Sequence, residues 1–272
     1  MWPGRSRHAI TAPMSESSSD RIYTACVLII GNEILSGRTK DSNLAWLAER
    51  LNEAGIRLRE ARVVSDVEDD IVRAVNEVRA RYDYVFTTGG IGPTHDDITA
   101  DCVAKAFGVP LREHPEALAR LAAGYANPAV DLNAARRRMA RVPEGGTLID
   151  NPVSRAPGFK IGNVYVMAGI PRVMQSMFDS IRSTLKGGKP LLARQIGAEL
   201  PEGRMAEGLS ALQNRYGDLE IGSYPFNRMG KVGAAIVLRG TDKARIDAAA
   251  EELKVLMKSL GGEPIEEAIT SA

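Results

Sequence analysis

The sequence has almost no cysteine, no surplus of either charge and no long apolar run. Two of its 272 residues are cysteine, too few for the disulfide framework of a small secreted domain. Lys plus Arg number 35 and Asp plus Glu number 34, a formal net charge of +1. No global field therefore draws the chain to nucleic acid or to an anionic membrane surface, and we expect neither as a partner.

The longest apolar run lies around Ala25 to Ile30, far below the roughly 20 residues that span a bilayer. We therefore expect no membrane segment, and the scarcity of cysteine favours a reducing, cytoplasmic location. Cys26 and Cys102 lie inside a predicted strand and a predicted helix, and they fit small buried side chains better than a nucleophile. The composition, 44% hydrophobic and 25% charged, is that of a globular protein that can bury a full core without disulfides.

Both ends of the chain lack the periodicity of packed elements. Residues 1–20 are rich in Arg, Ser, Pro and Gly and predict a disordered tail. They lack the apolar centre of a secretory signal and the amphipathic face of a transit peptide, and Met14 is an alternative start of translation. A second tail is expected at 263–272.

Strands and helices alternate over residues 21–186. Apolar runs predict strands at 22–30, 56–64 and 82–88, and a helical stripe predicts a helix over 42–54. Asp66 is expected to cap the helix that follows the second strand. This alternation implies an α/β domain with a mainly parallel sheet. Further helices are expected after Pro115, at 133–140 and at 173–185, and further strands at 147–149 and 163–167.

The segment from Lys186 to Pro190 reads Lys-Gly-Gly-Lys-Pro and predicts a linker. Beyond it the expected order is a strand, a helix, two consecutive strands and a final helix. Two strands between two helices suggest a small α+β domain of the split βαβ kind over 191–262.

A glycine-rich turn follows the third predicted strand and precedes a helix that runs to about Phe107. Glycine amides and the positive end of a helix dipole favour an oxyanion, and open α/β sheets bind ligands at this edge. Glycines alone also fit a plain tight turn, but a mere turn does not need the hydroxyls that crowd this one. The expected phosphate-binding residues of this turn are Thr88, Gly89, Gly90, Gly92, Thr94 and Thr99.

Two adjacent carboxylates follow in the same turn, and both are candidate catalytic residues. Asp96 and Asp97 cannot both cap the next helix, so either Asp97 is the cap and Asp96 is free, or the reverse. A divalent cation such as Mg²⁺, Mn²⁺ or Co²⁺ needs only one or two carboxylates besides substrate phosphates. His95 is a possible general base, although a lone loop histidine is more often a solvated bystander.

The loop from Gly31 to Asn43 is expected at the same edge of the sheet. Glu33 and Asp41 are candidate metal ligands together with Asp96 and Asp97. Ser36 and Asn43, with Asn151 after a later strand, are candidate substrate contacts. The alternative is a polar surface loop in which Asp41 or Ser42 merely caps the next helix.

Together these motifs resemble the molybdopterin-binding MoaB/Mog fold family, and within it the amino-terminal domain of CinA-type proteins, the competence/damage-inducible group. The resemblance covers roughly residues 23–185. It rests on the run from Gly31 to Gly37, on Asp41-Ser-Asn43, on Asp66 and on the run from Thr87 to Thr99. It implies a three-layer domain that binds molybdopterin or a nucleotide. The segment around Ile221 to Pro225 looks like the small middle domain of the eukaryotic FAD synthase group.

The resemblance also bears on the reaction. Asp96 and Asp97 stand where the cofactor-synthesis branch carries an Arg-Asp pair, and a carboxylate cannot pair directly with a phosphate. A bridging metal is then needed. This favours a metal-dependent hydrolase of nucleotide pyrophosphates such as ADP-ribose or a flavin dinucleotide, an activity that the CinA-like and FAD-synthase-like groups imply.

One departure from the CinA-like pattern favours a different function. Val173 stands where CinA-like proteins usually have a glutamate. The alternative is therefore a molybdopterin- or nucleotide-binding protein without turnover, linked to molybdenum cofactor metabolism. A third interpretation is an oligomer scaffold. Because members of this fold commonly form dimers or trimers, a homo-oligomer is expected.

Overall fold

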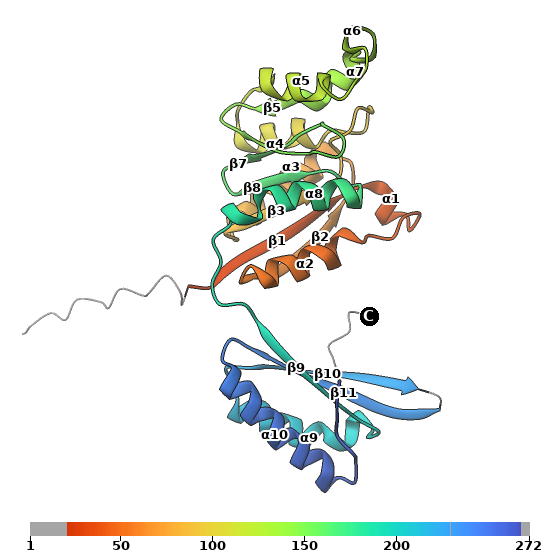
Figure 1. The fold of residues 1–272 in the computed structure, drawn as a ribbon, viewed down its shortest axis with the longest axis vertical. Coiled ribbons are helices and arrows are strands. Elements are labelled where there is room, and N and C mark those ends of the chain that lie inside the picture. The colour runs from red at the N-terminus through yellow and green to blue at the C-terminus, as the bar shows by residue number, and fades with distance from the viewer. Residues whose placement is uncertain (1–20, 229, 268–272) are drawn as a thin grey trace, which may run out of the picture. The chain divides into compact units, whose positions relative to one another are not determined.

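The computed structural model describes residues 21–228 and 230–267. The chain divides into two compact units, residues 1–189 and 190–272, and each is described by itself (Figure 1). The tail predicted at 1–20 and the last five residues of the tail predicted at 263–272 lie outside the described residues.

The first unit is built on a six-stranded sheet. Its strand order is β2-β1-β3-β8-β7-β6, in which the first four strands are parallel and the last two antiparallel. The expected mainly parallel sheet is thus confirmed. Strand β7 was not predicted. The strands are β1 (Tyr23–Ile30), β2 (Ile56–Val64), β3 (Tyr84–Thr88), β6 (Thr147–Ile149), β7 (Gly158–Ile161) and β8 (Val164–Met167).

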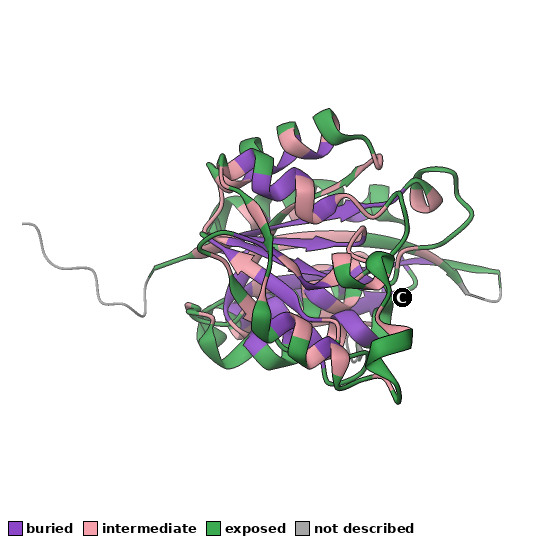
Figure 2. Cartoon of the chain, turned by 90° about the horizontal axis from the view of Figure 1, so that it is seen from above, coloured by how far each residue is buried: buried purple, intermediate pink, exposed green. Residues whose placement is uncertain are grey.

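Helices cover both faces of this sheet and make three layers. On one face α2 (Asn43–Glu53) and α8 (Pro171–Ile181) pack against Phe86 and Tyr165. On the other face lie α3 (Glu68–Arg79), α4 (Thr99–Phe107) and α5 (Pro115–Ala122). Figure 2 shows the buried residues along the strands and on the inner faces of the helices. The short elements are α1 (Asn32–Leu35), β4 (Leu111–Glu113), α6 (Pro128–Asp131), α7 (Ala134–Arg137), η1 (Arg138–Ala140), β5 (Arg141–Pro143) and η2 (Arg182–Thr184).

Strand β1 is buried on both faces, which explains its continuous apolar run. Cys26, Leu28 and Ile30 face one helical layer, and Ala25, Val27 and Ile29 face the other. Both cysteines are buried as predicted, and burial raises the pKa of each thiol to about 12. Neither is therefore a thiolate at neutral pH.

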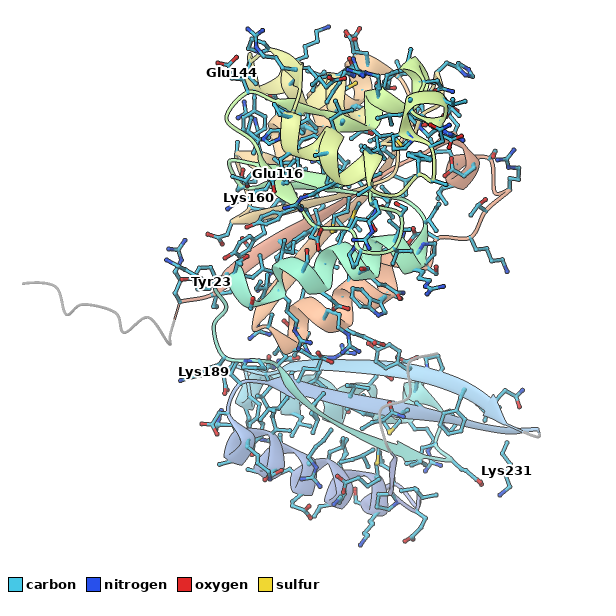
Figure 3. All side chains as sticks on the ribbon, turned by 45° about the horizontal axis from the view of Figure 1, so that its top comes forward. Tyr23, Glu116, Glu144, Lys160, Lys189 and Lys231 are labelled. Carbon is cyan, nitrogen blue, oxygen red and sulfur yellow. The ribbon has the colours of Figure 1, made fainter. Side chains whose placement is uncertain are left out.

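The second unit is a four-stranded sheet in the order β10-β11-β9-β12 with every neighbour antiparallel. Side chains of α9 (Glu202–Arg215) and α10 (Lys243–Ser259) share one apolar core with the strands, which confirms the small α+β architecture. Figure 3 shows Lys231 at the tip of the β10–β11 hairpin, where its ammonium lies 2.7 Å from Glu199. The strands are β9 (Leu192–Ala198), β10 (Glu220–Arg228), β11 (Lys231–Gly240) and β12 (Ile265–Glu267).

Strand β12 lies in a segment that the sequence assigned to the tail, and that assignment was wrong at 265–267. Three residues cannot show an alternation. The strand is fixed instead by pairing with β9 and by the guanidinium of Arg194, whose Nε and Nη2 each lie 2.7 Å from a carboxylate oxygen of Glu266. Over residues 21–228 and 230–267, no helix has both the length and the apolar character needed to cross a membrane.

Candidate functional site

Four polar turns and the start of α2 meet at the carboxyl edge of the parallel strands. A Cβ on Gly89, after β3, would overlap the carbonyl oxygen of Ile30 at the end of β1. A Cβ on Gly169, after β8, would lie 3.3 Å from the Cα of Gly89. The Nδ2 of Asn43 donates to the carbonyl oxygen of Gly169 at 2.7 Å. The structure therefore brings together turns that are far apart in the sequence.

Asp66, after β2, joins this edge in a way that the sequence did not predict. The N-cap position of α3 is Val67, so the capping role expected for Asp66 is wrong. Instead its Oδ2 accepts a hydrogen bond from the backbone N–H of Asn32 at 2.8 Å. The carboxylate therefore ties the turn after β2 to the start of α1.

The glycine turn is held in a left-handed conformation by its close approach to α4. Gly89 and Gly90 have φ of +103° and +66°, and a Cβ on Gly90 would overlap the hydroxyl of Thr99. The Thr99 hydroxyl donates to the carbonyl oxygen of Gly89, and its N–H donates to that of Gly90, both at 3.0 Å. Thr99 is fully buried, so it braces the turn and leaves no free donor for a phosphate. Thr88 is also buried.

The same turn presents backbone donors that no acceptor in the described part of the chain uses. Among the described residues, the N–H groups of Gly90, Ile91 and Gly92 have no hydrogen-bond acceptor. Successive unpaired amides of this kind form an anion-binding concavity, and the amino end of α4 adds the positive end of its dipole. The phosphate-binding role of Gly90 and Gly92 stays a prediction.

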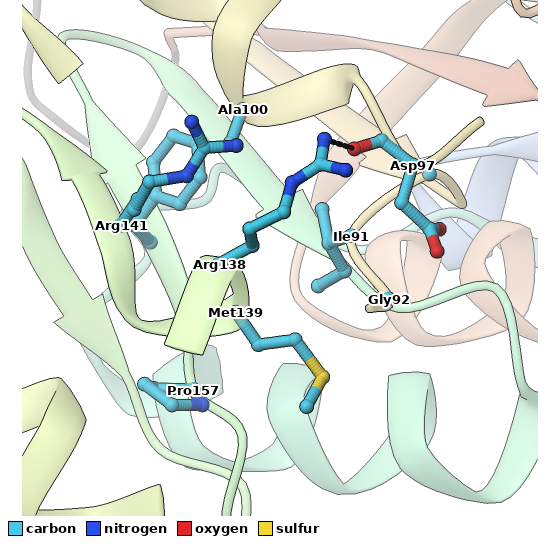
Figure 4. Close-up of a pocket in the computed structure, with 10 residues that line it drawn as sticks. Ile91, Gly92, Asp97, Ala100, Arg138, Met139, Arg141 and Pro157 are labelled. Atoms are coloured by element: carbon cyan, nitrogen blue, oxygen red, sulfur yellow. Dashed lines mark hydrogen bonds between the residues drawn. The ribbon is translucent and has the colours of Figure 1, made fainter. Parts of the chain in front are cut away.

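These glycines line a small pocket together with two arginines that the sequence analysis missed (Figure 4). Arg138 and Arg141 come from η1 and β5. The signal that points to them is the group of four arginines within residues 136–141. The pocket has a volume of about 20 Å³, room for about one water molecule or one phosphate oxygen. The rest of any ligand must lie outside it, on the exposed rim.

The two adjacent aspartates form a turn of their own, and neither caps α4. The N-cap position is Ile98, and no side chain makes a capping bond there, so both alternatives weighed from the sequence are wrong. The Oδ2 of Asp97 accepts from the N–H of Thr94 at 2.8 Å and from its hydroxyl, which turns the carboxylate back along the loop. The Thr94 hydroxyl and a backbone N–H hold the pKa of the exposed Asp96 carboxyl below its usual range.

The four carboxylates predicted as metal ligands do not form one centre. Within the described part of the chain, no group of three or more His, Cys, Asp or Glu side chains is placed to hold a metal ion. The Oδ1 of Asp41 accepts from the N–H of Leu44 at 2.8 Å, so this residue serves the start of α2. The Glu33 carboxylate folds back over Gly31, where a Cβ would lie 2.6 Å from it. Of the four, only Asp96 and Asp97 remain neighbours, in the turn from Thr94 to Asp97, which we call the acidic turn.

The predicted substrate contacts Asn151 and Ser36 have local partners. The Oδ1 of Asn151 accepts from the N–H groups of Val153 and Ser154, and its Nδ2 donates to Ser154 Oγ and to Ala156 O. Its amide therefore closes its own turn and leaves no group for a ligand. The Ser36 hydroxyl donates to the carbonyl oxygen of Glu33 at 3.3 Å.

Asn43 and Val173 are both buried close to the site. The Oδ1 of Asn43 is buried without a partner in the described residues, so this side chain retains an unused acceptor. Val173, on α8, is 6% exposed and belongs to the apolar core on that face of the sheet. The position at which CinA-like proteins usually have a glutamate therefore holds a buried apolar side chain here.

Both units match known protein families. Residues 26–187 match the family described as a probable molybdopterin binding domain, and residues 190–261 match the FAD synthase middle domain. A protein from Archaeoglobus fulgidus is 32% identical over 237 residues, which cover 85% of this chain and 96% of the relative. That similarity extends across both units.

Two further similarities concern the first unit. A CinA-like protein from Myxococcus xanthus is 36% identical over 168 residues, 58% of this chain and 40% of that protein. The crystal structure of the protein CinA, of unknown function, from Thermoplasma acidophilum is 34% identical with a TM-score of 0.56, and the match covers 62% of this chain and 99% of that one. The chain spans less than half of the CinA-like relative and 66% of a relative from Pyrobaculum calidifontis.

Proposed function

Because this chain belongs to the family of the probable molybdopterin binding domain and is CinA-like, we propose that it binds a phosphorylated small molecule at the glycine turn and hydrolyses nucleotide pyrophosphates. The substrate class is a dinucleotide-like compound such as ADP-ribose or a flavin dinucleotide. The FAD synthase middle domain matched by residues 190–261 is consistent with a substrate of this class.

The observation that carries the proposal is the row of unpaired amides at Gly90, Ile91 and Gly92 beside a cationic side chain. Over the described ranges these N–H groups have no internal acceptor, and Arg138 lines the same pocket. Three donors and a guanidinium suit a phosphate group, because charge-assisted hydrogen bonds to phosphate are about twice as strong as neutral ones. The exposed rim outside the pocket leaves room for the remainder of a nucleotide.

A divalent cation fits this site only with the help of the substrate. Asp96 and Asp97 provide two adjacent carboxylates, fewer than the three or more ligands of a resident metal. Mg²⁺ is commonly held by one or two carboxylates together with substrate phosphates, so this donor set fits a cation that arrives with the nucleotide. When bound, such a cation neutralises charge that develops on the phosphoryl oxygens. The chain's own amides and Arg138 hold the phosphate in place.

The test is to incubate the purified full chain with ADP-ribose or FAD in the presence of Mg²⁺, Mn²⁺ or Co²⁺. We expect release of AMP, and we expect at least a tenfold loss in the Asp96→Asn and Asp97→Asn variants. Arg112→Gln is the matched control, since Arg112 lies on β4 and pairs with Glu144, outside the site. A folded protein that releases no AMP with any of the three cations would overturn the hydrolase proposal.

A second candidate function is binding without turnover, favoured by the buried Val173 in place of a glutamate. In this case the protein binds a nucleotide or molybdopterin as a carrier or sensor in molybdenum cofactor metabolism. Calorimetry decides between the two functions. Saturable binding of ADP-ribose or molybdopterin with no product after prolonged incubation supports binding alone, and release of AMP at a rate set by the enzyme concentration excludes it.

A further inference from the structure

We propose that Arg138 is a positioning residue of this site with two separable roles. It holds the turn that carries Asp96 and Asp97, and it supplies the positive charge that faces the phosphate at Gly90 to Gly92. The second role rests on the proposed function, and the first does not. The sequence did not link this residue to the site, because it lies more than 40 positions from the turn that it contacts.

The first role follows from two hydrogen bonds. The Nη1 of Arg138 donates to the carbonyl oxygen of Thr94 at 3.1 Å, and its Nη2 donates to that of Asp97 at 3.2 Å (Figure 4 draws the second). These two carbonyls flank the acidic turn. The same turn is closed from inside by the bond from Asp97 N to Thr94 O at 3.3 Å. One planar guanidinium therefore clamps both ends of the segment that presents the two carboxylates.

The second role follows from how the nearby charges pair. Arg141 takes both oxygens of Asp101, with Nη1–Oδ1 at 3.1 Å and Nη2–Oδ2 at 2.7 Å. Arg138 lies 3.9 Å from the same carboxylate, beyond hydrogen-bond distance. Its own hydrogen bonds go to neutral carbonyls. The Asp97 carboxylate is directed away from the guanidinium in Figure 4. Among the described residues, Arg138 is thus the cation at this pocket that donates no hydrogen bond to a carboxylate, and the longer ion pair with Asp101 leaves its charge only partly balanced.

The two roles make different demands on the side chain. Clamping two carbonyls needs the rigid fork of arginine, whereas attracting a phosphate needs only a positive charge. Lysine keeps the positive charge but lacks the planar guanidinium with its paired donors. Methionine, of similar length, lacks both the charge and the donors. Arg138→Lys and Arg138→Met therefore separate the two roles, with Arg112→Met on β4 as the control for removing an exposed arginine.

Hydrogen exchange on the full chain without ligand tests the clamp. The reporters are the amides of Asp97 and Ile98, which are bonded inside the turn. We expect both Arg138 variants to speed exchange of these amides at least tenfold, and Arg112→Met to leave it unchanged. Exchange as slow in Arg138→Met as in the wild type would overturn the clamping role, whether or not the protein binds a nucleotide.

Calorimetry with ADP-ribose at low and moderate salt tests the charge. We expect Arg138→Met to weaken binding at least tenfold and to flatten the salt dependence, and Arg138→Lys to stay within a few-fold of the wild type. A purely structural role would instead move both variants together, and equal affinities of Arg138→Met and the wild type would overturn the charge role. A wild-type protein that binds no ADP-ribose overturns the proposed function and the charge role with it, while the exchange result for the clamp still stands.

Discussion

The Nδ2 of Asn43 donates a hydrogen bond to the carbonyl oxygen of Gly169 at 2.7 Å across 126 positions of sequence. The bond joins the first residue of α2 to the turn between β8 and α8, beside the glycine turn. Two helices of one layer are therefore fixed to each other at the edge where the candidate site lies. The bond has only one orientation, because the amide nitrogen must face the carbonyl.

We predict that Asn43→Asp destabilises the first unit by about 2 kcal/mol. The carboxylate cannot donate to Gly169, and it is buried opposite a carbonyl oxygen. Asn214→Asp, at an exposed position of α9, is the control. Urea unfolding followed by the fluorescence of Trp46, which packs edge-on against Phe178, measures the difference. Equal midpoints for Asn43→Asp and the wild type would contradict the structural role of this bond.

Gly90→Ala and Gly108→Ala form a matched pair. Both glycines have φ of +66°, but a Cβ on Gly90 would overlap the Thr99 hydroxyl, whereas one on Gly108 meets nothing within 4 Å. Gly108→Ala is expected to cost about 1 kcal/mol through the left-handed backbone alone. Gly90→Ala is expected to cost about 2 kcal/mol more through overpacking and to abolish ADP-ribose binding. Similar losses of stability in the two variants would show that the close contact with Thr99 is unimportant.

Thr87→Val is expected to stabilise the first unit by about 1 kcal/mol. The Thr87 hydroxyl is fully buried and has no partner among the described residues, so valine removes an unsatisfied polar group at nearly the same volume. Thr99→Val provides the contrast, because its hydroxyl bonds to Gly89, and we expect a loss of about 1 kcal/mol. The same unfolding measurement applies, and a destabilised Thr87→Val variant would refute the reasoning.

The ion pair of Arg194 and Glu266 predicts a pH dependence in the second unit. Hydrogen bonding to the Arg194 guanidinium is the main cause that lowers the pKa of Glu266 from 4.5 to about 2. A carboxyl group whose pKa is lower in the folded state stabilises the fold fully above about pH 4.5. This stabilisation is lost as the pH falls toward 2. Since Glu266 is 45% exposed, solvent screening reduces the gain to about 1 kcal/mol.

Glu266→Gln is therefore expected to be less stable than the wild type at pH 7 and equally stable near pH 2. Urea unfolding followed by the methyl NMR signals of Met205 and Met257, both buried in the core of this unit, reports on it selectively. A stability difference that persists unchanged from pH 7 to pH 2 would contradict the pairing.

The sequence was sufficient where structure depends on near neighbours. The apolar run of β1 and the stripe of α2 follow from residues within one or two turns of each other, so strand, helix and parallel order could be read directly. Capping was predicted less well. Asp66 was expected to cap α3, and either Asp97 or Asp96 to cap α4, but the amides of Asn32 and Thr94 bind the carboxylates of Asp66 and Asp97 instead.

By itself, the sequence determined that polar turns with glycines, hydroxyls and carboxylates end the strands of a parallel sheet, because strand polarity alone puts them at one edge. Only the tertiary structure decided which charges face the glycine turn. Arg138 reaches that turn because η1 leads directly into β5, which packs against α4. Asp41 is engaged by the N–H of Leu44, and the Glu33 carboxylate folds back over Gly31. The physical reason is that periodicity encodes burial, whereas the pairing of distant charges depends on how whole layers pack.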